Sequence, residues 1–274
     1  MKRTLVALHG LLGTPTLFDV LGAKLRGHRL LALTLPGHGS PASPVPATFE
    51  AAADAIAAQL RTLGPVDLVG YSLGGRLALA LLAHHPGVVR RAVILSAHPG
   101  LATEAERVAR AVDDEANAVL VEQHGLEAFV DAWEQQPLFT SQHRLAPHLL
   151  AQQRQARLSH EPGGIAASLR AHGLGRMPSY AAVVAAHADR IAWITGALDE
   201  KFGGVARALR SASPGLAVEV IPAAGHNPLL EEPLVTAARV ESLLGEDTPS
   251  IPRPVVGDSP AERWQAARPP KEKT

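Results

Sequence analysis

The sequence has no cysteine, no net charge and no long apolar run, and each absence excludes a class of protein. Without cysteine among its 274 residues, the chain has no disulfide framework, no thiolate metal site and no cysteine nucleophile. Its 26 basic side chains are balanced by 26 acidic ones, which argues against a nucleic-acid binder, because such proteins need a basic face. No window approaches the roughly 18 consecutive apolar residues of a membrane span.

The N-terminal segment also lacks the pattern of a secretion signal. The apolar stretch that follows Arg3 ends at Leu8, where His9 and Gly10 break it, and it is too short for a signal h-region. We therefore expect a cytoplasmic protein with no nucleic-acid partner and no membrane span. The sequence carries no signal for an oligomeric state.

What the sequence does contain is a series of short apolar runs, each ending in glycine, proline or a small polar residue. They are Leu5–Leu8, Leu30–Leu35, Val66–Val69, Ala92–Leu95, Ile191–Thr195 and Ala217–Ile221. Uniformly apolar runs of this length indicate strands buried on both faces of a parallel sheet. Helical spacing of apolar residues over Phe49–Leu63 and Leu73–His85 places helices between strands. The alternation predicts the α/β class with a doubly wound, mostly parallel sheet.

This alternation stops between Leu101 and His187, where the pattern is helical. The candidate helices are Ala105–Val121, Leu126–Glu134 and His143–Leu158. A helical insertion between two strands predicts a cap over the carboxyl edge of the sheet, where open α/β sheets bind ligands; a subdomain that only packs is the alternative. We thus expect a core of residues 1–100 and 188–246, a helical cap of 101–187, and a flexible tail of 247–274, which holds six prolines and charges of both signs.

The segment from Gly70 to Gly75 carries the sharpest local signal. It reads Gly-Tyr-Ser-Leu-Gly-Gly and connects a predicted strand to a predicted helix. A serine on such a sharp turn needs small neighbours, because the backbone there is strained and closely packed. This context favours Ser72 as a catalytic serine over an ordinary serine in a glycine-rich turn, and it points the backbone N–H of Leu73 at the same place.

A catalytic serine needs a base and a carboxylate that orients the base, in the chain order Ser, acid, His on this scaffold. Asp199 follows one predicted strand and His226 follows the last one. Glu200 is the rival acid, but the Gly-x-x-Asp turn favours Asp199. After the first strand, the turn that begins with His9 and Gly10 offers the N–H of Leu11 as a second oxyanion donor beside Leu73.

The remaining histidines form no metal-binding pattern. The sequence has no H-E-x-x-H motif, and His84 and His85 are helix neighbours that point apart. His38, in the tight turn after the second strand, is predicted to be structural. We therefore expect a site with no metal and no cofactor.

The turn at His9, the elbow at Ser72, Asp199 and His226 resemble the α/β-hydrolase family, over roughly Leu5–Leu244. Longer phrases resemble one branch of it, the 2-succinyl-6-hydroxy-2,4-cyclohexadiene-1-carboxylate synthases of menaquinone biosynthesis. These phrases are Gly70–Arg76, Ala97–Leu101, Trp133–Phe139, Asp199–Phe202 and Ala224–Asn227. The resemblance implies a carbon–oxygen lyase in which the triad abstracts a proton and pyruvate leaves by 2,5-elimination.

The substrate implied by this resemblance is a small polycarboxylate, so basic side chains are expected around the serine. Arg76 lies one helical turn after Ser72, where a charge is costly to bury unless it meets an anion. The cap offers Arg107, Arg110, Arg154 and Arg157, of which the flanking phrases align Arg110 and Arg154 with the family's anion-binding arginines. Tyr71 and Trp133 resemble its aromatic site residues.

Two other functions fit the same residues. A serine hydrolase that cleaves a carboxylate-bearing ester or amide would use Ser72 as a nucleophile, and the triad alone does not separate it from a lyase. A non-catalytic receptor on the same fold has no need for all three of Ser72, Asp199 and His226. Residues 101–187 hold ten acidic residues and seven arginines, so individual arginines rather than a broad basic field must recognise an anionic substrate.

Overall fold

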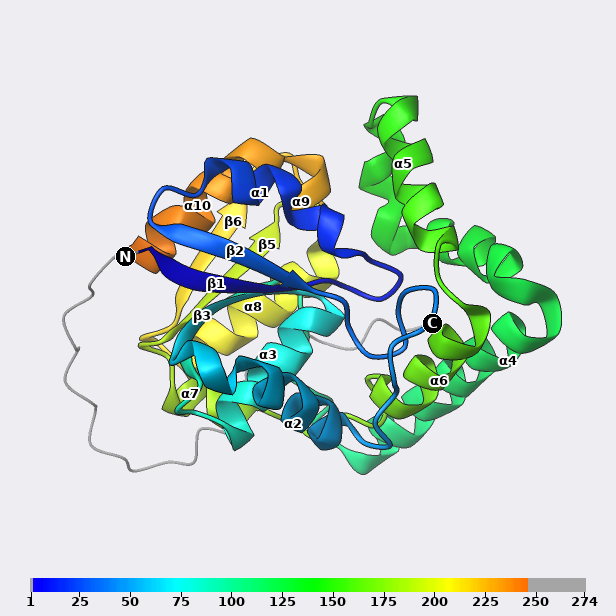
Figure 1. Cartoon of the computed structure of the whole chain (residues 1–274), viewed down its shortest axis with the longest axis horizontal. Helices are drawn as coiled ribbons and strands as arrows, with labels where there is room; N and C mark the ends of the chain where they lie inside the picture. Colours follow the sequence, from blue (N-terminus) through cyan, green and yellow to red (C-terminus); the bar gives the residue numbers. More distant parts are fainter. Residues whose placement is uncertain (1, 246–274) are drawn as a thin grey trace.

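In a computed structural model of the protein, which describes residues 2–245, the strands form one six-stranded parallel sheet (Figure 1). The strands are β1 (Arg3–Leu8), β2 (His28–Leu33), β3 (Val66–Tyr71), β4 (Val89–Leu95), β5 (Ile191–Gly196) and β6 (Ala217–Ile221). Their order is β2-β1-β3-β4-β5-β6, and every neighbouring pair is parallel. The chain therefore switches direction across the sheet at β1 and β3, which is where doubly wound sheets place their ligand sites.

Helices cover both faces of this sheet. The helices outside the long connection from β4 to β5 are η1 (Pro15–Phe18), α1 (Asp19–Lys24), α2 (Phe49–Leu60), η2 (Arg61–Leu63), α3 (Leu73–His84), α8 (Glu200–Ala212), α9 (Pro228–Glu231) and α10 (Pro233–Gly245). Helices α2, α3 and α8 share one buried apolar cluster with the sheet, and α1 and α10 share the other. This two-sided burial explains why the strand sequences are mostly apolar; Asp67 in β3 is a buried exception, paired with His28 and Arg90.

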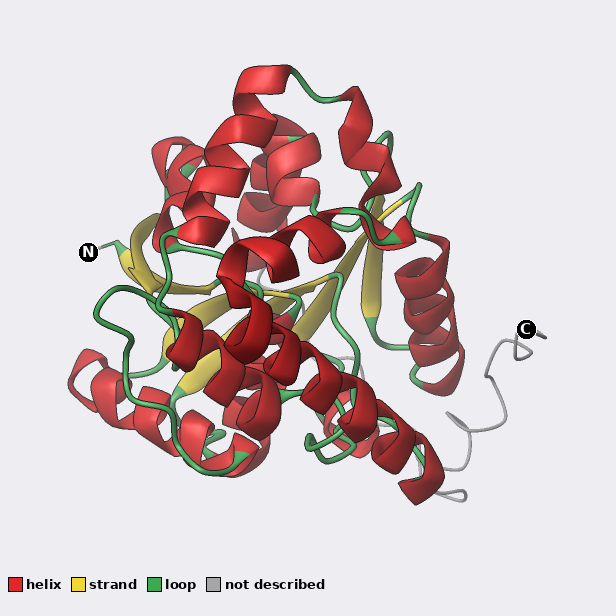
Figure 2. Cartoon of the chain, turned by 90° about the vertical axis from the view of Figure 1, so that its right-hand side faces the viewer, coloured by secondary structure: helices red, strands yellow, loops and turns green. Residues whose placement is uncertain are grey.

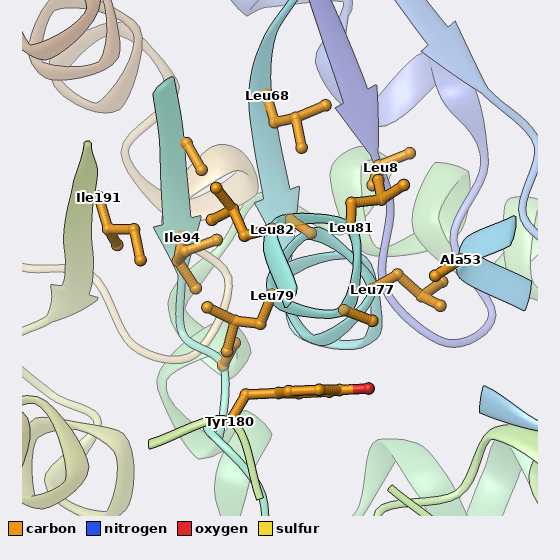
Figure 3. Close-up of a cluster of buried hydrophobic side chains, with 14 of the residues drawn as sticks. Leu8, Ala53, Leu68, Leu77, Leu79, Leu81, Leu82, Ile94, Tyr180 and Ile191 are labelled. Atoms are coloured by element: carbon orange, nitrogen blue, oxygen red, sulfur yellow. The ribbon is translucent and has the colours of Figure 1, made fainter. Parts of the chain in front are cut away.

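Alternate residues of each strand enter opposite clusters, as strand geometry requires. In β1, Val6 and Leu8 pack with α2 and α3, whereas Leu5 and Ala7 pack with α1 and α10. Figure 3 shows the first cluster around α3, whose leucines point both toward the strands and outward to Tyr180. The central strand β3 is buried along its whole length, so the turn that follows it is held rigidly.

The connection from β4 to β5 contains helices and no strand, and all of its residues are described. We call residues 101–187 the inserted helical segment. It comprises α4 (Glu104–Glu134), η3 (Pro137–Arg144), α5 (Pro147–Leu158), α6 (Pro162–His172) and α7 (Ala181–Ala186). Helices α4, α5 and α6 lie beyond the carboxyl ends of β1 and β2 (Figure 1), and the view from that side shows helices in front of the sheet (Figure 2).

The inserted helical segment has its own apolar cluster, which also reaches the core. Phe129 and Val130 of α4 pack there against Ile165 and Leu169 of α6, and Leu12 of the turn after β1 joins them. Helix α4 is interrupted at Gly125, whose φ of 84° and ψ of 166° are not helical, so the two helices predicted on either side of that position are present and meet at a kink.

The strand predictions and the fold class are confirmed by this structure. The second strand begins at His28 rather than Leu30 and ends at Leu33. Helices α6 and α7 were not predicted. The expected tail of residues 247–274 lies outside the described residues. Across residues 2–245, none of the helices combines the length and the apolar character needed to cross a membrane.

Candidate active site

Ser72 lies at a strained turn between β3 and α3. Its φ and ψ are 51° and −108°, a left-handed conformation that non-glycine residues seldom adopt. A Cβ atom on Gly70 would lie 2.5 Å from the carbonyl oxygen of Gly74, and one on Gly74 would overlap the carbonyl of Leu8. The two glycines of the G-x-S-x-G pattern are thus required by close backbone packing, and the packing holds Ser72 at the carboxyl edge of the sheet.

Asp199 and His226 meet behind this serine. The Nδ1 atom of His226 lies 2.8 Å from Oδ2 of Asp199, and both side chains are buried. The other carboxylate oxygen of Asp199 accepts the backbone N–H of Phe202 at 3.0 Å, so the carboxylate also caps the N-terminus of α8. It is Asp199, not the neighbouring Glu200, that orients the histidine. With Asp199 accepting at Nδ1, the Nε2 atom is left as the atom that can take a proton.

Two backbone N–H groups face the same region from different strands. Leu73 is the first residue of α3, so its N–H has no partner within the helix. The N–H of Leu11 has no hydrogen-bond acceptor among the described residues. The neighbouring Leu12 adopts a φ of 59° and donates its N–H to Nε2 of the buried His38 at 3.2 Å. His38 therefore fixes the turn that carries Leu11.

A cavity of about 300 Å³ opens between the sheet edge and the inserted helical segment. It is lined by seven of the predicted site residues: Leu11, Ser72, Leu73, Arg76, Arg110, Trp133 and His226. Asp199 lies behind His226, and the buried ring of Tyr71 lies 5.5 Å from the imidazole ring of His226. Trp133 stacks between Phe129 and Phe139, whose ring lies 6.0 Å from His226, so one wall of the cavity is aromatic.

Another wall of the cavity carries cationic side chains, and Asp113 and Asp114 line the cavity as well. Arg76 donates from its guanidinium to the backbone carbonyl of His172 at 2.9 Å and lies over the ring of Phe49. Burial, which is the larger cause, and the charge of Arg110 together lower the pKa of Arg76 to about 9, while Asp114 acts in the opposite direction. Asp114 is already engaged, because it accepts from Arg110 at 2.8 Å and from the N–H of Gly175. An anion bound in this cavity would offset the repulsion between the positive charges of Arg76 and Arg110.

Two further basic residues of this wall were not assigned a role from the sequence. Lys201 lines the cavity, and burial followed by the charge of Arg110 lowers its pKa. His98 also lines it; burial and the nearby charges of Lys201 and Arg76 lower its pKa to about 3. His98 follows β4 and Lys201 follows β5. This position after a strand is the signal by which the sequence could have pointed to them as site residues.

Arg154 is not brought to this cavity. It lines a second groove, between α4, η3 and α5, and it lies 2.7 Å from Asp131 and 3.0 Å from Glu134. Glu127 is a third carboxylate partner at 3.3 Å. The placement of Arg154 therefore does not support the substrate-binding role expected from the sequence alignment, because its charge is satisfied within the inserted helical segment.

No group of three or more His, Asp or Glu side chains suited to hold a metal ion occurs in residues 2–245. The buried histidines beside the site are engaged in other contacts. His38 also donates to the carbonyl of Pro36, and His9 accepts the N–H of Leu35 at 3.1 Å. Burial lowers the pKa of His9 to about 4, so these rings act as neutral hydrogen-bonding groups.

Comparison with known proteins agrees with this architecture. Residues 5–239 match the Alpha/beta hydrolase family, and the chain belongs to that family. It is 35% identical to the putative 2-succinyl-6-hydroxy-2,4-cyclohexadiene-1-carboxylate synthase of Bacillus subtilis (strain 168), with 89% of this chain and 90% of the relative covered. The synthase of that name from Enterobacter sp. (strain 638) is 33% identical, over 90% of this chain and 94% of the relative.

A solved structure gives the same grouping. The structure of MenH from S. aureus superposes on this chain with a TM-score of 0.82 and 29% sequence identity, and covers 88% of this chain and 93% of its own. The similarity extends over the core strands and the inserted helical segment together, because a match restricted to the sheet would cover far less of either chain.

Proposed function

We infer that this protein catalyses the 2-succinyl-6-hydroxy-2,4-cyclohexadiene-1-carboxylate synthase reaction, in which pyruvate is eliminated from a polycarboxylate precursor in menaquinone biosynthesis. The observation that carries this inference is the cluster of Arg76, Arg110 and Lys201 in the cavity that also holds Ser72 and His226. An esterase for apolar substrates has no use for three cations around its serine. The relatives that share most of this chain carry the synthase name.

The triad acts here as a base. His226, oriented by Asp199, takes the proton of the Ser72 hydroxyl while the Ser72 oxygen takes the acidic C–H proton of the substrate. The electron pair of that bond moves through the ring, and the carbon–oxygen bond to the pyruvyl group breaks. No acyl-enzyme is formed. Pyruvate leaves with the electrons of the broken bond, and the proton held at His226 returns to solvent or product.

The backbone N–H groups of Leu11 and Leu73 stabilise the negative charge that develops on the substrate carbonyl as the proton leaves. Donors of this kind are effective because they are already oriented before the reaction. Arg76, Arg110 and Lys201 bind the carboxylates and direct the acidic C–H at Ser72, which is a contribution to positioning. Trp133 supplies an aromatic wall for the ring, whereas Tyr71, expected from the sequence to bind substrate, is buried against His226 and does not line the cavity. The proposal includes no metal and no cofactor.

A cytoplasmic location and a small-molecule partner belong to the same proposal. The relatives named above are synthases. The substrate implied by that name is a small, soluble polycarboxylate. The mixed-charge surface of residues 101–187 leaves recognition to the few cations inside the cavity.

A serine hydrolase for a small carboxylate-bearing ester is the second candidate. The strained turn at Ser72 fits this function as well. Such a turn exposes the serine hydroxyl, and exposure serves a nucleophile as much as a base. In that case Ser72 would form an acyl-enzyme, and the same N–H pair would bind the tetrahedral oxyanion.

One assay separates the two candidates. The purified protein is given the menaquinone-pathway precursor, and pyruvate release is followed; a parallel sample is given a p-nitrophenyl ester. We expect fast pyruvate release and slow ester cleavage. Fast ester cleavage without pyruvate would establish the hydrolase instead.

A further inference from the structure

Glu231 is a buried carboxylate beside the loop that carries His226, and the reaction described above gives it no role. Its side chain is fully buried. One oxygen, Oε2, accepts the backbone N–H of Gly225 at 2.7 Å, and the other, Oε1, accepts the N–H of Asn227 at 3.1 Å. A single carboxylate thus accepts the backbone N–H groups of the two residues that flank the histidine.

Only a carboxylate can make both of these bonds. It presents two oxygens that accept and none that donate, whereas an amide presents one acceptor and one donor. Hydrogen bonds from backbone N–H groups to an ionised carboxylate are shorter and stronger than neutral ones. The bond to Asn227 fixes the peptide that follows His226, and the bond to Gly225 fixes the peptide one residue before the histidine. The backbone that carries His226 is therefore held at both ends, and Asp199 then orients the imidazole ring.

The same carboxylate also contacts the inserted helical segment. Arg144 of η3 lies 3.6 Å from Oε2 of Glu231. A Cβ atom on Gly225 would overlap the side chain of Ser141, which also belongs to η3. The loop of His226 is therefore packed directly against η3, and Glu231 lies where the two meet. Its charge is also one of the groups that raise the pKa of Tyr71, after burial, which is the larger cause.

We propose that Glu231 is a positioning residue for His226. It holds the histidine loop so that the imidazole faces Ser72 across the cavity, and through Arg144 it links that loop to the inserted helical segment. The inference rests on the proposed role of the triad, but it applies equally to a lyase and to a hydrolase, because both need His226 in the same orientation.

The principal test is Glu231→Gln, which keeps the size of the side chain and removes one acceptor. We expect kcat to fall roughly 10- to 100-fold, as for small misplacements of a reacting group, while KM stays within about twofold because Glu231 does not touch the substrate. Arg144→Ala should lower kcat in the same direction by a smaller factor. The matched control is Glu232→Gln, which changes the adjacent carboxylate; that side chain has no hydrogen bond or ion pair with the described residues.

A double variant distinguishes positioning from a general effect on the fold. If Glu231 acts through the triad, Glu231→Gln should not lower the residual rate of Ser72→Ala any further. A fall in the double variant as large as in the single variant would overturn the proposal, and so would a kcat for Glu231→Gln within about twofold of wild type. Should Glu231→Gln fail to fold, the cycle is run with Arg144→Ala, with the same two criteria.

A measurement without substrate separates this proposal from the proposed reaction. The proton between Nδ1 of His226 and Asp199 gives a far-downfield NMR resonance, and Glu231→Gln should shift or broaden it while Glu232→Gln leaves it in place. A shifted resonance in a protein that releases no pyruvate would refute the reaction and support the positioning role. An unchanged resonance would refute the positioning role whatever the reaction is.

Discussion

Arg76 and Arg154 carry the same charge in very different surroundings. Arg76, at the carboxyl edge of the sheet, donates to a backbone carbonyl and lies near Arg110, and burial lowers its pKa to about 9. Arg154, in α5, has three carboxylate neighbours, and the hydrogen bonds that it donates to Asp131, foremost, and to Glu134 raise its pKa. The first arginine has unused capacity for an anion, and the second has none.

The contrast extends to the regions that hold them. On the outer side of the inserted helical segment, arginines pair with acids; Arg170, for instance, bonds to Glu115 and Glu122. Around the cavity, Arg76 and Lys201 have no carboxylate within ion-pair distance among the described residues. Burying a cation without a partner costs free energy. A protein that maintains that cost beside a triad is built to bind a ligand that offsets it.

The largest loss of activity should come from Ser72→Ala, which removes the serine beside Arg76 in the cavity. We expect pyruvate formation to fall by about 10³-fold or more, because groups that act as a unit are lost together. Ser168→Ala is the matched control, since Ser168 lines the same cavity and has no role in the proposed reaction. Retention of more than about a tenth of the wild-type rate by Ser72→Ala would remove the base role.

Arg76→Met should have the next largest effect. We expect kcat/KM for the polycarboxylate to fall about 10- to 100-fold, mainly through KM, because a charge-assisted hydrogen bond to a carboxylate is lost. The midpoint temperature of unfolding should rise slightly. The lowered pKa of Arg76 means that its charge destabilises the folded protein, and the substitution removes that charge. Steady-state kinetics and a thermal melt on the same sample measure both. An unchanged kcat/KM would contradict the anion-binding role.

Lys201→Met should weaken binding less. Its side chain reaches solvent at the mouth of the cavity, and the described structure gives it a contact with the ring of Phe202. Because solvent screens such a charge, we expect KM to rise about two- to fivefold at low salt, and the difference from wild type to shrink as salt is added. Lys201→Arg, which keeps the charge, is the control and should leave KM close to wild type.

Arg154→Ala should have the smallest effect on activity. We expect kcat and KM within about twofold of wild type, because the arginine lies outside the cavity and its exposed ion pairs are worth little. Arg170→Ala, a paired arginine of the same segment, should behave alike. A loss of kcat/KM in Arg154→Ala comparable to that of Arg76→Met would mean that the second groove belongs to the substrate site.

Much of the fold could be predicted because its signals are local. Each strand contains a mostly apolar stretch in the sequence, and the structure explains this by burial on two faces, as in β3. The shift of β2 has a local cause: its first two residues, His28 and Arg29, are polar, so the apolar run begins after the strand does. Helix α6 was missed because its first turn is Pro162, Gly163 and Gly164, residues that disfavour helix interiors.

The candidate site divides in the same way. Ser72, Asp199 and His226 could be predicted because each follows a strand, and strand ends converge at one edge of a parallel sheet. Lys201 and His98 also follow strands, but a lysine or histidine just after a strand gives no sign of whether it faces a cavity. Arg154 was misplaced because an alignment of short phrases contains no information about three carboxylates that approach from another helix.

By itself, therefore, the sequence determined the succession of strands along the chain, the helical character of residues 101–187 and the sharp turn at Ser72. All three depend on residues adjacent in the chain: apolar periodicity, and glycines at Gly70 and Gly74 where a Cβ atom has no room. Only the tertiary structure decided which cations are left without a carboxylate and that Glu231 brackets His226. Those facts depend on distances between side chains and backbone groups that folding brings together, and charge pairing falls off too steeply with distance for composition to reveal it.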